Sequence, residues 1–425
     1  MRKEQISDAL NLLNDTFIVE TDVLRNRRRQ KQKCSIMQKV IYPMGRHWKW
    51  AAAAACLILA VSAISGISLW KPANIEQPAK TKKLPMLSIT ENTSDGMGFE
   101  GFWAYDISEL TNNNPWDEAA QPSALPVYQN QLSYNKDFIA SGADFGKIRG
   151  FLTDIAGRLG LDASSLAITD DTPDEATKKE ITEKLEGDVP DGYFNPTKLT
   201  AEADGMEISV DQTMLGTVSF EPALALPEQY HFTDSASYEE TAAVAEYLKE
   251  KYKNLIHMDS PLCDIDGGHY SSLETGSGIQ QEYRISFYEA GRNNVESIIN
   301  YNFRRIRFDC DDTGKLSLVG LSQTDLSKKM GDYPVITAEE AKKLLSNGNY
   351  ITSVPYKLPG IDYVAKAELV YRTGAREEYF MPYYRFYVEL PEEERDGLKT
   401  YGIYYVPAVE KKYLSNMPLW DGSFN

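Results

Sequence analysis

The densest cluster of side chains that could bind a metal ion in this chain is Cys263-Asp264-Ile265-Asp266-Gly267-Gly268-His269. Asp264 and Asp266 resemble the first ligands of a calcium loop, but no third carboxylate or Asn follows at the required spacing. A zinc site needs three or four nitrogen or sulfur ligands, and Cys263 and His269 supply only two. The paired glycines are typical of a loop. We therefore expect no metal site here.

A second acidic segment, 309–314, also resembles a calcium loop. In an EF-hand that began at Asp309, the bidentate Glu would stand where this chain has Gly320. The run Asp311-Asp312-Thr313-Gly314 instead predicts a tight turn between two strands, with Gly where a positive φ is needed.

Nucleophilic catalysis has few candidate residues. His231, His257 and His269 are the only histidines after residue 70, and no Ser lies in a G-x-S-x-G elbow. A triad whose members meet only in space stays open, because spacing along the chain does not reveal it. Neither a phosphate-binding loop nor a dinucleotide fingerprint is present. We expect a protein without enzymatic activity, catalytic residues or a cofactor.

An uncharged apolar run lies between Trp50 and Trp70, and it decides on which side of a membrane the rest of the chain is expected to lie. As a helix, residues 51–69 would reach about 28 Å, which matches the hydrocarbon core of a bilayer. Residues 25–49 carry basic charges and no acidic ones, so the positive-inside rule predicts a cytoplasmic 1–49 tail and an extracellular C-terminal part. The length of the run, and the roughly fifty residues before it, favour an uncleaved anchor over a signal peptide. A buried helix of a soluble fold is the alternative.

Charge differs sharply on the two sides of this run. Residues 1–49 hold 11 Lys and Arg against 5 Asp and Glu, a net charge of +6, so the remainder of this −17 chain is at −23. An acidic outer part argues against nucleic acid as a partner, since that needs basic patches. The basic stretch is a topology signal that also contacts membrane lipid. Of four cysteines, only Cys263 and Cys310 lie in the outer part, which makes them the candidate disulfide pair.

The fold class that we expect is α+β: one transmembrane helix (50–70), then an ectodomain of two or three helix-plus-antiparallel-sheet units. A linker (71–95) and an aromatic strap (96–130) precede units at 131–232, 233–331 and 332–425. Predicted helices cover 145–159, 174–185, 237–252 and 338–346, the last with a capping box of Thr337 and Glu340. Predicted strands include 281–290, 299–310, 315–323, 365–373, 379–390 and 402–410, and Asp204-Gly205 predicts a hairpin turn.

Three further segments are candidates for partner binding. Ile6, Leu10 and Leu13 share one face of a predicted helix in residues 4–24, which could dock a cytoplasmic protein or lie on the inner leaflet. The aromatic residues of the strap are expected to pack onto the following domain, with an exposed contact surface as the alternative.

The third candidate is the Tyr-rich last unit. Strand 379–390 alternates, so Phe380, Tyr384, Phe386, Val388 and Leu390 form a core face. Tyr383, Arg385 and Tyr387 lie on the other face, where they could bind cell-wall glycan or a peptide. The alternative is that a helix or a neighbouring strand covers them.

The start MRKEQISDALNLLNDTFIVETD, the Arg/Lys run and WKWAAAAACLILAV resemble uncharacterised single-pass membrane proteins of Clostridia-type Gram-positive bacteria. So do GFWAYDISELTNNNPW, YNFRRIRF and PYYRFYVELPEEERDGLKTYGIYYVPAV. The N-terminal layout is similar to that of membrane-bound anti-sigma factors, although their His/Cys zinc motif is missing, and the outer units loosely resemble PepSY-type modules.

This resemblance implies a membrane-anchored extracytoplasmic sensor or regulator whose tail contacts a sigma factor or another regulator. The alternative is an envelope-binding or scaffolding ectodomain, for a protein or glycan ligand, with a passive tail.

Overall fold

The structure is a computed structural model that describes residues 83–90, 100–132, 144–233, 235–272, 279–394 and 397–424. The predicted tail, with Ile6, Leu10 and Leu13, and the predicted membrane helix at 50–70 lie outside these ranges. Within them, no helix is both long and apolar enough to cross a bilayer.

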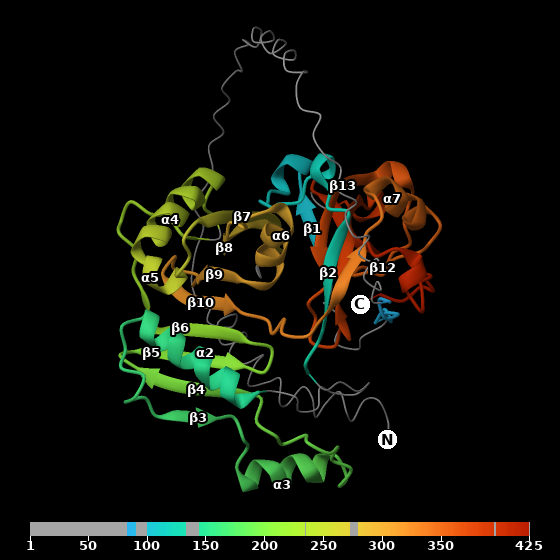
Figure 1. The fold of residues 1–425 in the computed structure, drawn as a ribbon. Coiled ribbons are helices and arrows are strands. Elements are labelled where there is room, and N and C mark those ends of the chain that lie inside the picture. Colours follow the sequence, from blue (N-terminus) through green and yellow to red (C-terminus); the bar gives the residue numbers. More distant parts are fainter. Residues whose placement is uncertain are drawn as a thin grey trace, which may run out of the picture. The chain divides into compact units, whose positions relative to one another are not determined.

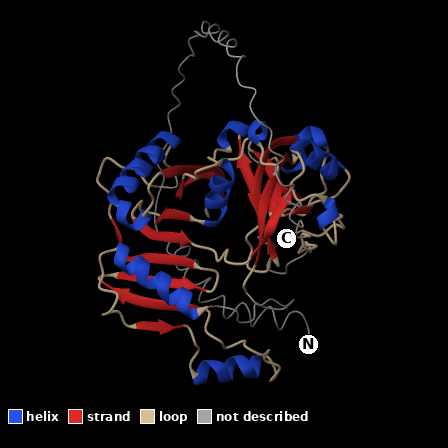
Figure 2. Cartoon of the chain, viewed as in Figure 1, coloured by secondary structure: helices blue, strands red, loops and turns tan. Residues whose placement is uncertain are grey.

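The described chain has an α+β fold with short helices on three antiparallel sheets (Figure 2). The largest sheet has eight strands in the order β3-β4-β5-β6-β10-β9-β8-β7. In chain order these are β3 (Ile168–Asp170), β4 (Lys198–Ala203), β5 (Met206–Asp211), β6 (Leu215–Leu224), β7 (Pro261–Ser272), β8 (Ile279–Glu289), β9 (Arg305–Cys310) and β10 (Leu316–Ser322). Because β6 pairs with β10, the segments 131–232 and 233–331 share one continuous sheet.

Local turn chemistry joins these strands as the sequence predicts. Asp204 and Gly205 connect β4 to β5 with positive φ angles of 51° and 75°. Gly314 has a φ of 77° in the turn between β9 and β10, where the Asp311 carboxylate accepts a hydrogen bond from the Thr313 N–H at 2.9 Å. Both predicted hairpin turns are confirmed.

Helices cover one face of this sheet (Figure 1). α2 (Phe145–Arg158) buries Ile148, Phe151, Leu152 and Ile155 against β4 and β5, while α4 (Tyr238–Lys251) packs on β7 and β8 and is followed by α5 (Lys253–Ile256). α3 (Glu175–Lys184) lies in the connection from β3 to β4 and buries Ile181 in a small cluster of its own. These three longer helices match the predicted ranges.

The predicted strand at 299–310 is wrong in its first half. Residues Asn294–Phe303 form helix α6, and only Arg305–Cys310 form strand β9. Ile299, Tyr301 and Phe303 alternate with polar residues, which is typical of a strand. A helix-start signal outweighs that pattern, because the Asn293 side chain caps the Glu296 N–H at 3.0 Å.

A five-stranded sheet forms the centre of the C-terminal half, with β12 paired to β16 beside the order β1-β16-β15-β13. Its strands are β1 (Gly101–Ala104), β12 (Ile351–Thr352), β13 (Val364–Tyr371), β15 (Pro382–Glu389) and β16 (Lys399–Pro407). The third sheet has the order β11-β2-β14, from β2 (Ala124–Gln129), β11 (Lys329–Pro334) and β14 (Tyr379–Phe380). The strap segment therefore supplies a strand to each of these two sheets.

The remaining elements are short helices. α7 (Ala338–Ser346) begins with the predicted capping box, since the Thr337 and Glu340 side chains each bond the other residue's backbone N–H. Single 3₁₀ turns occur at η2 (Ile107–Glu109), η3 (Glu118–Ala120), η4 (Ile361–Tyr363), η5 (Pro391–Glu393) and η6 (Lys411–Tyr413).

Both faces of the five-stranded sheet are buried. The predicted core face of strand 379–390 is confirmed, because Phe380, Tyr384, Phe386, Val388 and Leu390 all lie in a cluster with residues of α6 and α7. Tyr383 and Tyr387 lie in a second cluster, together with Leu87, Phe102 and Leu110 from the N-terminal side of the described chain.

The segment 84–90 is fastened to the C-terminal end of the chain. Leu87 is fully buried and forms a parallel bridge with Leu414. Its N–H donates to the Tyr413 carbonyl and its carbonyl accepts from the Ser415 N–H, both at 2.8 Å. The Asn416 side chain bonds both the N–H and the carbonyl of Ile89, at 2.7 Å and 2.9 Å.

Candidate functional site

The tyrosine face that we considered for partner binding is not accessible. Tyr383 is 0% exposed and Tyr387 is 2% exposed, and the ring of Phe102 from β1 stacks edge-on against Tyr387 at 5.3 Å. The partner-binding role predicted for Tyr383, Arg385 and Tyr387 is therefore corrected to a structural one. Strand β1 and the segment 84–90 cover this face, as the alternative reading of the sequence proposed.

Arg385 belongs to a buried ion cluster centred on Glu368, which is 3% exposed. The Glu368 carboxylate accepts hydrogen bonds from Asn112 Nδ2 at 2.6 Å and from the Arg385 guanidinium, and it lies 2.7 Å from Lys366 Nζ. Burial alone would raise the pKa of Glu368, but the two cations outweigh it and hold the pKa at about 2. The carboxylate is therefore ionised at neutral pH.

A second buried carboxylate, Asp264, lies on β7 of the eight-stranded sheet and is 0% exposed. It pairs with the Arg305 guanidinium and accepts a hydrogen bond from the Asn113 backbone N–H at 2.6 Å. Arg305 also lies over the Tyr301 ring, 4.7 Å from its centroid. Burial raises the pKa of Asp264, against the opposing pull of Arg305.

The segment 111–114 connects these two carboxylates, and we call it the Asn bridge. On one side, Asn113 contacts Asp264, the Thr111 hydroxyl donates to the Ile265 carbonyl at 3.1 Å, and Tyr288 donates to the Asn113 carbonyl at 2.8 Å. On the other side, Asn112 bonds Glu368, and Asn114 Nδ2 donates to the Leu369 carbonyl at 3.2 Å. The bridge therefore ties the eight-stranded sheet to strand β13 of the five-stranded sheet.

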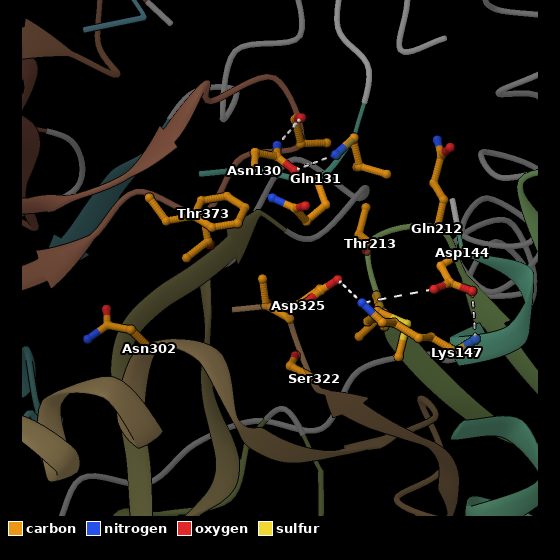
Figure 3. A pocket seen from close by; sticks show the side chains of 16 residues that line it. Asn130, Gln131, Asp144, Lys147, Gln212, Thr213, Asn302, Ser322, Asp325 and Thr373 are labelled. Carbon is orange, nitrogen blue, oxygen red and sulfur yellow. Dashed lines mark hydrogen bonds and ion pairs between the residues drawn. The ribbon is translucent and has the colours of Figure 1, made fainter. Parts of the chain in front are cut away.

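A cavity of about 410 Å³ lies near the end of α2 that carries the Asp144 cap (Figure 3). Its walls come from the residues after β2, the start of α2, the β5–β6 turn, α6, the residues after β10 and the β13–β14 connection. Both the eight-stranded and the three-stranded sheets thus contribute. This volume falls within the range of about 300–1,000 Å³ that is usual for small-ligand pockets.

The charged groups of this cavity are paired with one another. Lys147 Nζ lies 2.6 Å from Asp325 Oδ2 and 4.0 Å from Asp144 Oδ2. Partial burial raises the pKa of Asp325, but its hydrogen bonds with Lys147 and Ser327 prevail and lower it. Asp144 also caps α2 by accepting from the Gly146 and Lys147 N–H groups, at 3.0 Å and 3.2 Å. Figure 3 shows Lys147 directed at the Asp325 carboxylate.

Sequence reasoning missed this cavity because its walls come from six separate segments. The local signal available in the sequence is Asp144, directly before the predicted helix at 145–159, and an Asp at this position indicates a helix cap rather than a binding site. The polar residues of the walls are of ordinary types at unremarkable spacing, so only their meeting in space marks them.

The residues that the sequence suggested for catalysis, metal binding or a disulfide are distributed over several elements of the fold. His231 and His257 are exposed in loops, whereas His269 lies on β7. Cys263 on β7 and Cys310 on β9 are not bonded to each other, and strand β8 lies between their strands. Burial raises the pKa of the Cys263 thiol to about 12. No group of three or more His, Cys, Asp or Glu residues in the described ranges is arranged to hold a metal ion.

Comparison with known proteins gives little further guidance. No family model and no curated protein matches the chain. Among solved structures it is similar to an uncharacterised protein from Eubacterium rectale ATCC 33656, at 11% sequence identity and a TM-score of 0.29. The match covers 71% of this chain and 86% of the other.

Proposed function

We propose that this protein is a membrane-anchored extracytoplasmic sensor or regulator without enzymatic activity, whose N-terminal tail contacts a cytoplasmic regulator such as a sigma factor. The attachment of segment 84–90 is the observation that carries the proposal. The linker between Trp70 and Leu84 can span at most about 45 Å when fully extended. Beyond it, the chain enters the fold at Leu87 and is fixed to residues 413–416.

This attachment gives the ectodomain a direct covalent route to the proposed anchor. A ligand that changes the packing of the C-terminal end would change the position of Leu87 and hence the pull on the linker. A free, unattached linker would absorb such a change. The buried position of Leu87 and the paired bonds of Ile89 therefore suit a transmitting role better than a passive tether.

Site-specific photocrosslinking in living cells tests the cytoplasmic half of the proposal. The full-length chain carries benzoylphenylalanine at Ile6, Leu10 or Leu13, and at Asp8 or Asp15 as controls on the opposite face of the predicted helix. We expect the three apolar positions to crosslink a sigma factor that mass spectrometry identifies in the adduct, and the controls to give none. Adducts with lipid alone at all five positions would refute this version.

The second candidate function, a binding or scaffolding ectodomain with a passive tail, is favoured by the 410 Å³ cavity. The two candidates differ in what the tail contributes. Replacement of residues 1–47 by an unrelated basic tail should change the transcript profile of the cell if the protein is a regulator. An unchanged profile, with the chain still in the membrane, would favour the scaffold.

A further inference from the structure

Four neutral polar side chains on the cavity wall have no hydrogen-bond partner among the described residues: Gln212, Ser322, Thr324 and Thr373. They come from the β5–β6 turn, from the end of β10 and the residues that follow it, and from the loop after β13. Together they offer three hydroxyls and one amide, each able both to donate and to accept. Other polar groups of the wall are already used, since Asn130 bonds the Ala375 and Glu377 carbonyls at 2.8 Å and 2.9 Å.

The cavity is poorly suited to a charged ligand. Lys147 is held between Asp144 and Asp325, so its ammonium charge is already neutralised and the three groups together carry a net charge of −1. An anion would have to break this pairing and face the carboxylates, while a cation would compete with an ammonium group that is already in place. A neutral ligand meets neither cost.

Apolar surface completes the wall. Phe380, Met214 and Leu215 line the cavity beside the uncommitted polar groups. A mixture of donor-acceptor side chains and apolar patches fits a molecule whose faces are apolar and whose edge carries hydroxyls, which describes a sugar ring. The volume lies at the lower end of the pocket range, which limits the ligand to a small one.

We infer that this cavity binds a short neutral saccharide, with Gln212, Ser322, Thr324 and Thr373 hydrogen-bonding its hydroxyls. The inference rests on the ectodomain being a binding module, as both candidate functions require, and it names the class of ligand. Because the walls come from the eight-stranded sheet on one side and the β13–β14 connection on the other, a bound sugar contacts both at once.

Isothermal titration of the full-length chain in lipid nanodiscs tests this inference, with no sugar-based detergent present. The probes are cellobiose, maltose and N,N′-diacetylchitobiose, with unacetylated chitobiose and cellobiouronic acid as charged comparators. We expect saturable binding of at least one neutral disaccharide and weaker binding of its charged relatives.

Matched variants connect the binding to the cavity. Gln212→Ala, Ser322→Ala and Thr373→Val should each weaken binding about 2- to 12-fold, the range for loss of one neutral hydrogen bond. Thr373→Trp should abolish binding by filling the space. Gln229→Ala removes an exposed amide outside the cavity and should leave binding unchanged. Thermal melting of each variant shows that it is folded.

Three outcomes would overturn the inference. One is the absence of saturable heat with all three neutral disaccharides up to about 20 mM, well above the ~1 mM affinities of weak specific ligands. Another is tighter binding of a charged comparator, and the third is equal binding by Thr373→Trp and the parent chain. None of these results depends on the cytoplasmic tail, so a failure here is distinct from a failure of the crosslinking test.

Discussion

Replacing Glu368 with Gln removes a buried negative charge that pairs with both Arg385 and Lys366. The amide keeps the shape of the side chain and can still accept from Asn112, but the two cations lose their counter-charge. Removing one partner of a buried ion pair costs about 3–5 kcal/mol, since it leaves charge uncompensated. The pKa of Glu368 gives an independent figure: a fall from 4.5 to about 2 corresponds to about 3 kcal/mol.

These free-energy changes correspond to a fall in the melting temperature of the protein. Unfolding entropy is ~2.1 cal/mol/K per residue, so a fold of about 300 residues loses ~5–8 °C for a destabilisation of 3–5 kcal/mol. Calorimetry at pH 7 on the full-length chain in nanodiscs measures it. Glu389→Gln at the end of the neighbouring strand β15 is the control, because the Glu389 and Lys399 side chains are 29% and 42% exposed and ion pairs near the surface contribute only about 0–1 kcal/mol.

A Glu368→Gln variant that melts within about 1 °C of the parent, or no lower than Glu389→Gln, would refute the reasoning. A triple variant, Glu368→Leu with Arg385→Met and Lys366→Met, refines the interpretation. Replacing a whole buried ionic group by apolar residues is often neutral. Recovery of most of the lost stability in the triple variant would show that the cost lies in the unpaired cations.

Three further predictions follow from single residues. The difference in free energy of unfolding between the parent and Glu368→Gln should be fully present above about pH 4.5 and should shrink as the pH falls toward about 2. In that range the unfolded chain binds a proton at Glu368, whereas the folded chain keeps this carboxylate ionised because its pKa is about 2. Denaturant titrations from pH 7 to 3 measure this difference, and a constant value would contradict the prediction. Gly267→Ala should lower the free energy of unfolding by about 1–3 kcal/mol, because its Cβ would lie 2.7 Å from the Glu109 carbonyl oxygen and 2.8 Å from the Thr111 hydroxyl of the Asn bridge. Gly150→Ala in α2 is the matched control, because its Cβ would meet no atom within 4 Å, and it should raise the free energy of unfolding by about 0.4–1 kcal/mol. Cys263 should react with iodoacetamide at pH 8 on the order of 10³ times more slowly in the folded chain than in urea, because burial raises the pKa of its thiol to about 12. Peptide mass spectrometry follows the reaction, and equal rates in the two states would contradict that pKa.

Local chemistry made part of the fold predictable. Asp204-Gly205, Gly314 and the Thr337–Glu340 box each act within four residues, so their turns and cap could be read directly from the chain. Helix α6 shows the limit, because alternation at Ile299, Tyr301 and Phe303 competed with the Asn293 cap. Both signals are local, and the cap prevails in a helix whose Ile298, Ile299 and Phe303 also pack in the core beside the C-terminal sheet.

The candidate site lay beyond sequence reasoning for a different reason. The alternation of strand 379–390 correctly separated two faces, yet it could not show that Leu87 and Phe102 cover the second. These partners lie hundreds of positions earlier in the chain, and no local pattern encodes such a contact. The cavity around Lys147 and Thr373 is assembled in the same way, from segments distant in the chain.

The sequence by itself determined the charge asymmetry between residues 1–49 and the remainder, the expectation of an anchor, the hairpin turns and most of the helices. Each of these depends on composition or on neighbours within one or two turns of chain. Tertiary structure alone decided the burial of Tyr383 and Tyr387, the Glu368 and Asp264 ion clusters joined by the Asn bridge, and the cavity. Those features arise from side chains that become neighbours only when distant strands pair and pack, which no local rule specifies.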